Sequence, residues 1–283
     1  MMMKKKLWSF LALMMFVLSF EGHELTVMSF NIRYDSGSDG PLNSWKQRRD
    51  SLCSYVRRVS PDVFGMQEVL KNQLDDVASR LSDWAYVGVG RDDGKSKGEF
   101  NPVFYRKSKY RLMDKGWFWL SKTPEKPSFG WDAACRRIAV WVVLADKETN
   151  EKLLFCNSHF DHMSVKARME SAKLCKTRLD SIRGNMPVVF TADFNTNDKE
   201  LTYSLLLDYA FPMLDVWKKA DLSVGGPASF NDWGRRMNND LSKIDFIFVS
   251  EEVRIDRAEI HDSKMGDGRF LSDHNAHWSH III

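Results

Sequence analysis

Polar side chains that could bind a ligand stand at the ends of short apolar runs in this sequence. Glu68 follows "DVFGMQ", and Asp193 follows "VVFTA", with Asn195 two residues further on. Residues two apart in an extended chain point to the same side, so Asp193 and Asn195 can address one ligand. A carboxylate at the end of a buried run is costly unless it meets water, a cation or a hydrogen-bond donor. The pattern therefore favours a site that holds a cation or another polar ligand.

Imidazoles and further acids occupy similar places. His159 lies where "LLFCNSHF" ends, Asp273 and His274 stand side by side, Asp245 lies at the start of "IDFIF", and Asn31 lies near the end of "LTVMSFNIR". A buried carboxylate at Asp245 could hold an imidazole in one tautomer. Taken singly, each residue is more often a satisfied histidine, a turn or a helix cap. Because such residues end strand after strand, we expect them to share one site.

The elements that must position these residues follow from the apolar pattern. Alternation and short apolar runs predict strands over 25–33, 62–67, 85–89, 102–105, 111–120, 138–145, 153–160, 186–191, 244–249 and 276–283. Apolar residues at helical spacing predict helices over 45–59, 70–81, 165–183 and 199–208. Neither repeats nor low-complexity linkers interrupt the chain, which favours one continuous domain over 24–283. Stacked sheets between helical layers would bring the polar strand ends together.

The first residues are typical of a targeting segment. Lys4, Lys5 and Lys6 precede an apolar stretch from Leu7 to Phe20, and a polar break follows. This layout predicts a secretory signal peptide over 1–22, because the stretch is short for a membrane span. An uncleaved signal anchor is the alternative. We expect a secreted or periplasmic protein without stable membrane insertion after cleavage.

Composition sets few further limits. Of the 283 residues, 43% are hydrophobic and 28% are charged, as in an ordinary globular protein. The net charge of +3 neither demands nor excludes nucleic acid. The cysteines form no C-x-x-C pair, which argues against a zinc ribbon or a thioredoxin-like site. Export would permit disulfides, but Cys53, Cys156 and Cys175 lie in predicted helices and strands, so we expect buried free thiols. Nothing indicates the oligomeric state.

Six blocks of the sequence resemble, in order, the signature blocks of the endonuclease/exonuclease/phosphatase superfamily: "MSFNIRY", "DVFGMQEV", "NSHFDH", "TADFN", "KIDFIFVS" and "LSDHN". The resemblance runs over nearly the whole chain after the predicted signal peptide. It implies a four-layered α/β sandwich, with two packed, mostly antiparallel or mixed β-sheets flanked by helices. It also implies an active site at one rim of the sheets.

The resemblance further implies a Mg²⁺-dependent phosphoesterase, with Mn²⁺ as a substitute. Glu68 corresponds to the main metal ligand, assisted by Asn31 and Asp273. This agrees with the residue types, because Mg²⁺ prefers carboxylate and amide oxygens. A phosphoester is anionic, so its hydrolysis needs positive charge directed at the phosphate oxygens. A metal ion can supply that charge and orient the attacking water.

The same resemblance assigns the catalytic groups. Asp193 corresponds to the base that activates water, and Asn195 to a residue that orients water or substrate. His274, held by Asp245, corresponds to the residue that meets the scissile phosphate. His159 corresponds to a second imidazole that stabilises the pentacovalent phosphate or assists the leaving group. Carboxylates and imidazoles are the usual groups for such proton transfers.

Basic and aromatic residues before the strand at 138–145 could select the substrate. Arg137 could bind a phosphate with two donors, and Trp131 could stack on a base or sugar. The alternative is a solvated Arg136 and Arg137 with Trp131 in the core. The run 46–49 (KQRR) is predicted to be a solvated helix face.

Three functions follow from these patterns. The first expectation is hydrolysis of a phosphodiester, with nucleic acid as the partner. The second is a phosphatase or phosphodiesterase acting on a sugar, inositol or lipid headgroup. The third is a binding module without catalysis, which would predict gaps in the catalytic set, and the sequence has none.

Overall fold

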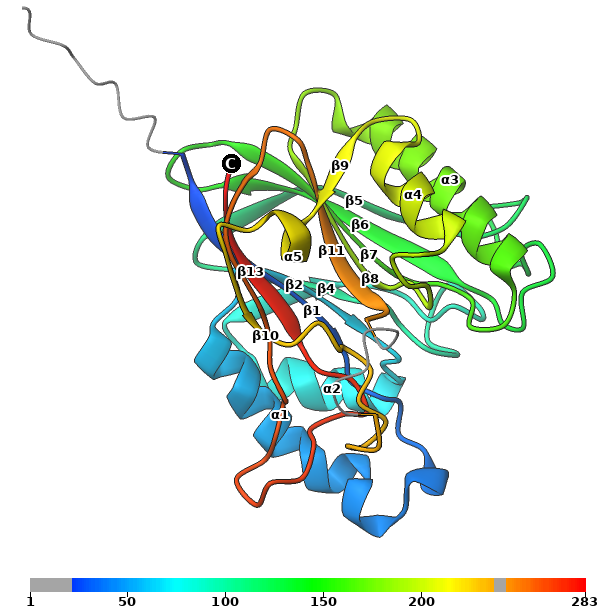
Figure 1. Cartoon of the computed structure of the whole chain (residues 1–283), viewed down its shortest axis with the longest axis vertical. Coiled ribbons are helices and arrows are strands. Elements are labelled where there is room, and N and C mark those ends of the chain that lie inside the picture. The colour runs from blue at the N-terminus through cyan, green and yellow to red at the C-terminus, as the bar shows by residue number, and fades with distance from the viewer. Residues whose placement is uncertain (1–21, 237–242) are drawn as a thin grey trace, which may run out of the picture.

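A computed structural model describes residues 22–236 and 243–283, so the predicted signal peptide at 1–22 lies almost wholly outside the described residues. Two β-sheets pack face to face between helices (Figure 1). The first sheet contains, in spatial order, β10 (Leu222–Gly225), β12 (Arg254–Ile260), β13 (His277–Ile282), β1 (Glu24–Asn31), β2 (Val63–Gln67), β4 (Val103–Arg106) and β3 (Trp84–Val87). The second contains β5 (Tyr110–Trp119), β6 (Ile138–Asp146), β7 (Lys152–His159), β8 (Val188–Asp193), β11 (Asp245–Ser250) and β9 (Met213–Asp215).

Helices cover the outer face of each sheet. Helices α1 (Trp45–Val59) and α2 (Lys71–Arg80) pack on the first sheet, and α3 (Val165–Arg183) and α4 (Leu201–Asp208) pack on the second (Figure 1). A third apolar layer lies between the sheets and is built from alternate residues such as Val27, Val63, Phe155 and Val189. Parallel pairs (β1 with β2, β7 with β8, β10 with β12) occur among antiparallel ones. The predicted four-layered α/β sandwich with mixed sheets is therefore confirmed.

The sequence pattern missed several short elements, most of them in the second half of the chain. These are the strands β9, β10 and β12, the short helix α5 (Val216–Lys219), and two 3₁₀ turns over Gly37–Asp39 and Pro41–Asn43. In β12, a register shift between Ile255 and Arg257 breaks the period-two alternation on which a strand prediction relies. The predicted helices at 45–59 and 165–183 have the same bounds in the structure.

Two remaining expectations concern cysteines and membranes. All four cysteines are free, and Cys53, Cys156 and Cys175 are buried as predicted, while Cys135 is half-buried. Among the described residues, no helix combines the length and the apolar character that crossing a bilayer requires.

A buried polar network joins the two sheets below their common rim. Asn157 of β7 donates to the carbonyl oxygens of Met66 (2.7 Å) and Pro102 (3.1 Å), next to strands of the other sheet. Its Oδ1 accepts from Gln67 Nε2 at 2.7 Å and from Thr191 Oγ1 at 3.0 Å. The sheets approach closely here, because a Cβ at Gly65 would lie 2.3 Å from the Asn157 side chain. Every hydrogen-bonding group of Asn157 is satisfied, so the network fixes one sheet against the other.

The pairing register of the strands determines which polar residues lie side by side at the strand ends. In the second sheet, Asp193 pairs with His159 on one side and with Asp245 on the other. In the first sheet, Asn31 pairs with Gln67, so Glu68 follows one residue beyond. Because β11 runs antiparallel to β8, its first residue meets the last residue of β8. The predicted residues from both sheets therefore meet at one rim.

The prediction of a solvated helix face over 46–49 is wrong for Arg48. Its side chain is fully buried, and its guanidinium donates to the carbonyl oxygens of Asn43, Ile32, Arg33 and Leu271. These carbonyls belong to three separate chain segments, which a solvated arginine would not join. Helical periodicity cannot distinguish a buried arginine from an exposed one. The carbonyl groups that accept the hydrogen bonds of Arg48 lie in other chain segments, outside the helical pattern.

We expect Arg48→Met to lower the free energy of unfolding by about 3 kcal/mol, because four buried carbonyls lose a charged donor. Urea unfolding followed by circular dichroism measures this difference. Arg49→Met is the matched control, since Arg49 forms a partly exposed ion pair with Asp76 (3.1 Å), and its loss should stay below about 1 kcal/mol. Equal stability losses in the two variants would contradict the structural role of Arg48.

Candidate active site

Most of the predicted site residues line one cavity of about 540 Å³ at the rim of the two sheets: Glu68, Arg137, His159, Asp193, Asn195, Asp273 and His274. Asn31 and Asp245 lie behind this lining and hydrogen-bond to residues in it. The polar lining of the cavity divides into an acidic end and a basic end. The acidic end contains Glu68, Asp193 and Asp273, and the basic end contains Arg91 and Arg137. The volume falls within the range of small-molecule sites.

Asp193 lies at the centre of the constellation and is 1% exposed. Its Oδ2 accepts from Asn31 Nδ2 at 3.0 Å and lies 3.5 Å from His159 Nε2 and 3.7 Å from His274 Nε2. Its Oδ1 accepts the backbone N–H of Asn195 at 3.0 Å. Burial, and secondarily the charge of Asp245, raise the pKa of Asp193 to about 7. A carboxyl group with such a pKa can accept a proton from water near neutral pH.

The two histidines beside Asp193 hold opposite protonation states. His274 Nδ1 donates to Asp245 Oδ2 at 2.8 Å. Burial opposes the charged form, but the charge and the hydrogen bond of Asp245 outweigh it and raise the pKa of His274 to about 10. The pKa of His159 falls well below its usual value because of burial and the nearby charges of Arg137 and Arg91. His274 is therefore an imidazolium at neutral pH, whereas His159 is neutral.

Asn195 fixes the tautomer of the neutral histidine. Its Nδ2 donates to His159 Nε2 at 3.1 Å and to the Phe160 carbonyl oxygen at 3.1 Å. The proton of His159 then resides on Nδ1. Asn195 has a positive φ of 48°, a backbone conformation that is uncommon outside glycine and asparagine.

Glu99 is a site residue that the sequence pattern did not reveal. Its Oε2 accepts from Arg91 Nη1 at 2.7 Å and lies 3.8 Å from His159 Nδ1. Within the described parts of the chain, His159 Nδ1 is buried and donates no hydrogen bond, so Glu99 is the acid best placed to orient it. Glu99 stands in a polar loop after "GKSKG", where a carboxylate is ordinarily solvent-exposed. Only the fold brings it to His159.

The acidic end suits a divalent cation. Glu68 accepts from Asn31 Nδ2 and from the Tyr34 N–H, both at 3.1 Å, and ligand atoms of Glu68, His159 and Asp193 lie within 4.8 Å of one another. Burial raises the pKa of Asp273, and the charge of Glu68 adds to the shift. Such crowded, desolvated carboxylates repel one another unless a proton or a cation lies between them. Their oxygen-rich donor set fits Mg²⁺ or Mn²⁺.

Asn31 contributes to this end through its amide. Its Nδ2 bridges Glu68 and Asp193, while its Oδ1 accepts the backbone N–H of Arg33 at 3.0 Å. The predicted metal ligands thus lie together, with Asn31 hydrogen-bonded between two carboxylates. That Asn31, Glu68 and Asp273 bind the metal ion stays a prediction.

The two predicted substrate-binding residues have different positions. Arg137 lines the cavity at 4% exposure, and its Nη2 contacts His162 Nδ1 at 3.1 Å. Its Nε and Nη1 are buried and have no hydrogen-bond acceptor among the described residues. Trp131 is half-buried outside the cavity lining, where its carbonyl oxygen accepts from Ser164. A solvated Arg137 is thereby excluded, whereas the stacking role of Trp131 stays a prediction.

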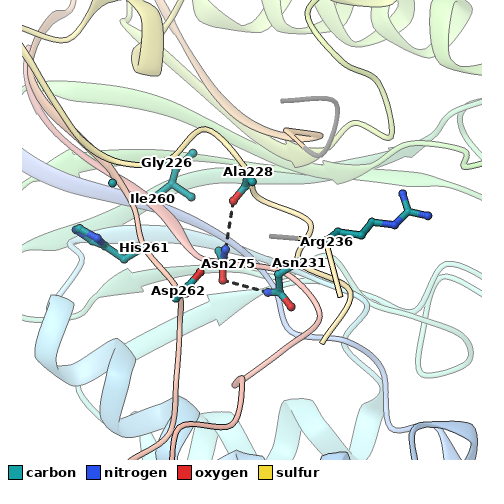
Figure 2. Close-up of a pocket in the computed structure, with 9 residues that line it drawn as sticks. Gly226, Ala228, Asn231, Arg236, Ile260, His261, Asp262 and Asn275 are labelled. Atoms are coloured by element: carbon teal, nitrogen blue, oxygen red, sulfur yellow. Dashed lines mark hydrogen bonds between the residues drawn. The ribbon is translucent and has the colours of Figure 1, made fainter. Parts of the chain in front are cut away.

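A second cavity, of about 400 Å³, lies behind the loop that carries Asp273 and His274. Figure 2 shows its two buried asparagines: Asn231 Nδ2 donates to Asn275 Oδ1 at 3.0 Å, and Asn275 Nδ2 donates to the Ala228 carbonyl oxygen at 3.2 Å. The backbone N–H of Asn231 also donates to the Asp273 carbonyl oxygen at 2.8 Å. Because these amides satisfy one another, this cavity supports the catalytic loop and creates no demand for a ligand.

The fold and the first cavity define a hydrolase of the phosphoesterase class. The chain belongs to the endonuclease/exonuclease/phosphatase family, whose profile matches residues 28–274. Enzymes of this family depend on divalent metal ions, which agrees with the acidic cluster. The family resemblance that the six sequence blocks predict is confirmed.

Two solved structures from Bacteroides species are similar over almost their whole length. An endonuclease/exonuclease/phosphatase from Bacteroides vulgatus is 39% identical, with a TM-score of 0.88 and coverage of 92% of this chain and 99% of that one. A mannosyl-6-phosphatase from Bacteroides thetaiotaomicron is 36% identical, with a TM-score of 0.85 and coverage of 92% and 100%.

A curated relative is more distant. Human tyrosyl-DNA phosphodiesterase 2 is 26% identical over 269 residues, which cover 89% of this chain and 67% of the human protein. Several other curated relatives are matched over less than two thirds of their length: 57% of the bovine tyrosyl-DNA phosphodiesterase 2, and 29% of an uncharacterised protein of Acanthamoeba polyphaga mimivirus.

We expect Asp245→Asn to move the alkaline limit of activity to lower pH. Asp245 raises the pKa of His274, so removal of its charge lets the imidazolium lose its proton at a lower pH, and activity that needs the imidazolium falls there. The pH profile of kcat/KM between pH 6 and 10 measures the shift. Asp146→Asn, which removes a buried carboxylate paired with His23 (3.1 Å) outside the cavity, should leave the profile unchanged. An unaltered alkaline limit in Asp245→Asn would contradict the role of this pair.

Proposed function

We propose that this protein hydrolyses phosphomonoesters of small molecules, with a phosphorylated sugar as the favoured substrate, in a reaction that requires Mg²⁺ or Mn²⁺. The observation that carries the proposal is the buried guanidinium of Arg137 in the lining of a cavity of about 540 Å³. Its Nε and Nη1 have no hydrogen-bond acceptor among the described residues, and Nε lies 3.9 Å from Asp161 Oδ2. A monoester phosphate is a dianion with three free oxygens, so it can engage the acidic, metal-binding end and the basic end together. The similarity to a mannosyl-6-phosphatase supports the same substrate class.

The residues of the cavity divide the chemistry among them. Glu68, Asp273 and Asn31 would hold the metal ion, which supplies positive charge to the phosphate and leaving oxygens when bound. Asp193 accepts a proton from the attacking water, and Asn195 orients the water through its contact with His159. The P–O bond to the alcohol breaks as the water oxygen bonds to phosphorus. The products are inorganic phosphate and the free alcohol.

The histidines stabilise the charge that develops on phosphorus. The imidazolium of His274, held by Asp245, donates to a phosphate oxygen from a site with little water. His159 lies on the other side of Asp193, beside Glu99 and the basic end, and assists the pentacovalent phosphate or the leaving group. Arg137 binds a terminal phosphate oxygen, which in a diester would carry the second ester carbon.

A nucleic-acid phosphodiesterase, the first expectation from the sequence, is the second candidate. The similarity to human tyrosyl-DNA phosphodiesterase 2, a phosphodiesterase named for a DNA substrate, favours it. We also propose export through the predicted signal peptide, which would direct the enzyme to substrates outside the cytoplasm. Periplasmic or secreted location can be tested by fractionation of cells expressing the full chain.

The test incubates residues 24–283 and Mg²⁺ with hexose 6-phosphates and, separately, with end-labelled single-stranded RNA and DNA. Phosphate release from the sugar phosphates without shortening of the oligonucleotides is the expected result. Asp193→Asn is the control for contaminating phosphatase, and it should lower kcat by about a hundredfold or more. Shortened oligonucleotides with intact sugar phosphates would reject the monoesterase proposal and establish the second candidate.

We expect Glu68→Gln to raise the Mg²⁺ concentration for half-maximal activity by about tenfold or more, because an anionic ligand becomes neutral. Metal titration of the initial rate measures this change, and isothermal titration calorimetry measures metal binding directly. An unchanged titration in the folded variant would remove Glu68 from the metal site.

We expect Arg137→Met to raise KM for the monoester by about tenfold or more, because two charged hydrogen bonds to phosphate are lost. Arg136→Met is the matched control, since Arg136 is half-buried and faces Asp92 at 3.7 Å outside the cavity lining. Steady-state kinetics of both variants, with thermal melting to verify folding, provide the comparison. An equal KM in wild type and Arg137→Met would contradict the phosphate role of Arg137.

A further inference from the structure

A second arginine is fixed at the acidic end of the cavity. The Arg33 guanidinium donates to Asp39 through Nε (2.9 Å) and Nη2 (2.8 Å), a bidentate pair that sets its plane. It also stacks over the Tyr34 ring, with 4.4 Å between the guanidinium carbon and the ring centroid. Arg33 lines the cavity together with Glu68 and Asp273. Arg33 lies in the block "MSFNIRY", but the sequence resemblance assigned a role in that block only to Asn31.

The backbone of Arg33 is constrained as strongly as its side chain. Its φ of 55° lies in the left-handed region, which non-glycine residues adopt only when the surroundings hold them there. Its N–H donates to Asn31 Oδ1 at 3.0 Å. Its carbonyl oxygen accepts from Gln73 Nε2 at 2.9 Å and from the buried Arg48 at 3.2 Å. These contacts fix the position of the residue before any ligand binds, as a preorganised binding group requires.

The Arg33 guanidinium lies near the carboxylates of the acidic end but does not hydrogen-bond to them. Arg33 Nη1 lies 3.8 Å from Glu68 Oε2, and Nε lies 3.8 Å from Asp273 Oδ2, distances longer than a hydrogen bond. Nη1 donates no hydrogen bond within residues 22–236 and 243–283. A simple counter-ion for Glu68 and Asp273 would contact their oxygens directly. Arg33 instead pairs with Asp39, which leaves the oxygens of Glu68 and Asp273 available for a cation and Nη1 available for an anion.

We propose that Arg33 is a further catalytic residue, which binds a phosphate oxygen of the substrate through Nη1. The proposal rests on the proposed function, because it assigns the phosphate of that reaction a contact at the acidic end. Arg33 and Arg137 both line this cavity, so under this proposal the two guanidinium groups hold one phosphoryl group. Two arginines with fixed planes restrain the phosphorus atom in line with the attacking water, which a single flexible cation would not achieve.

The test measures binding of inorganic phosphate, the expected product, to the Mg²⁺-loaded full chain by isothermal titration calorimetry. We expect Arg33→Met to weaken phosphate binding by about tenfold and to lower kcat/KM by about a hundredfold. Arg33→Lys should recover part of the loss, because it keeps the charge but not the bidentate pair with Asp39. Asp39→Asn, which keeps Arg33 but loosens its plane, should give a smaller loss. Arg49→Met, a paired arginine outside the cavity, should bind phosphate as wild type does.

A merely structural role gives a different pattern. Arg33→Met would then bind phosphate with wild-type affinity while losing thermal stability or Mg²⁺ affinity, and this outcome overturns the proposal. Under the proposal, Mg²⁺ affinity in Arg33→Met is unchanged or tighter, since a positive charge near Glu68 and Asp273 is removed. The phosphate titration remains decisive if the wild type cleaves only diesters. The failure of the proposed function and the failure of this inference are therefore distinguishable.

Discussion

The rest of the active site depends on how closely the two sheets are held at Gly65. The side chain of Asn157 occupies the space that any larger residue would fill, and it bonds backbone carbonyls of the opposite sheet. Gln67 and Thr191 complete this network one residue below Glu68 and two below Asp193. A buried amide with all its groups satisfied tolerates little displacement, because any shift leaves a polar atom unpaired in an apolar layer. The network therefore restricts how the two strand ends above it can move relative to each other.

The buried network around Asn157 lets the protein hold several like charges close together, although they repel one another. Glu68, Asp193, Asp273 and Asp245 lie within one buried region, and burial raises the pKa of two of them, Asp193 and Asp273. Positive groups are interleaved with them, with His274 hydrogen-bonded to Asp245 and Arg33 between Glu68 and Asp273. The arrangement costs folding free energy, which the three apolar layers must offset. In return it supplies a base, an imidazolium and a cation-binding end within one cavity.

The loops at the rim are held by a second set of buried polar groups. Arg48 joins the segment after Asn31 to the segment before Ser272, and the Ser272 hydroxyl donates to the Asn31 carbonyl oxygen at 2.7 Å. Asn231 and Asn275 support the other side of the loop that carries His274. Loops are ordinarily the mobile part of such a rim, but here their carbonyls bond to buried side chains. The polar site residues on these loops are therefore held in place in the free protein.

The sequence alone determined the fold class, most of the strands and helices, and the group of polar residues at the strand ends. It could do so because strands, helices and motif blocks are each defined by residues that lie close together in the sequence. It did not reveal β12, whose bulge breaks the alternation, or the burial of Arg48, whose partners lie up to 223 residues away. Glu99 was missed because it stands in an ordinary polar loop. Arg33 was missed although it lies in the block "MSFNIRY", because the sequence does not show where its side chain points.

Only the tertiary structure decided the protonation states and the partners of the site. His159 ends an apolar run and His274 follows an acid. Burial, and secondarily the charge of Arg137, lower the pKa of His159, whereas Asp245 outweighs burial and raises the pKa of His274. Likewise, the sequence left open whether Arg137 is solvated, and the structure excludes that alternative because its side chain is buried. Electrostatic character depends on distances across the fold, and those distances are set by the packing of two sheets rather than by neighbours in the chain.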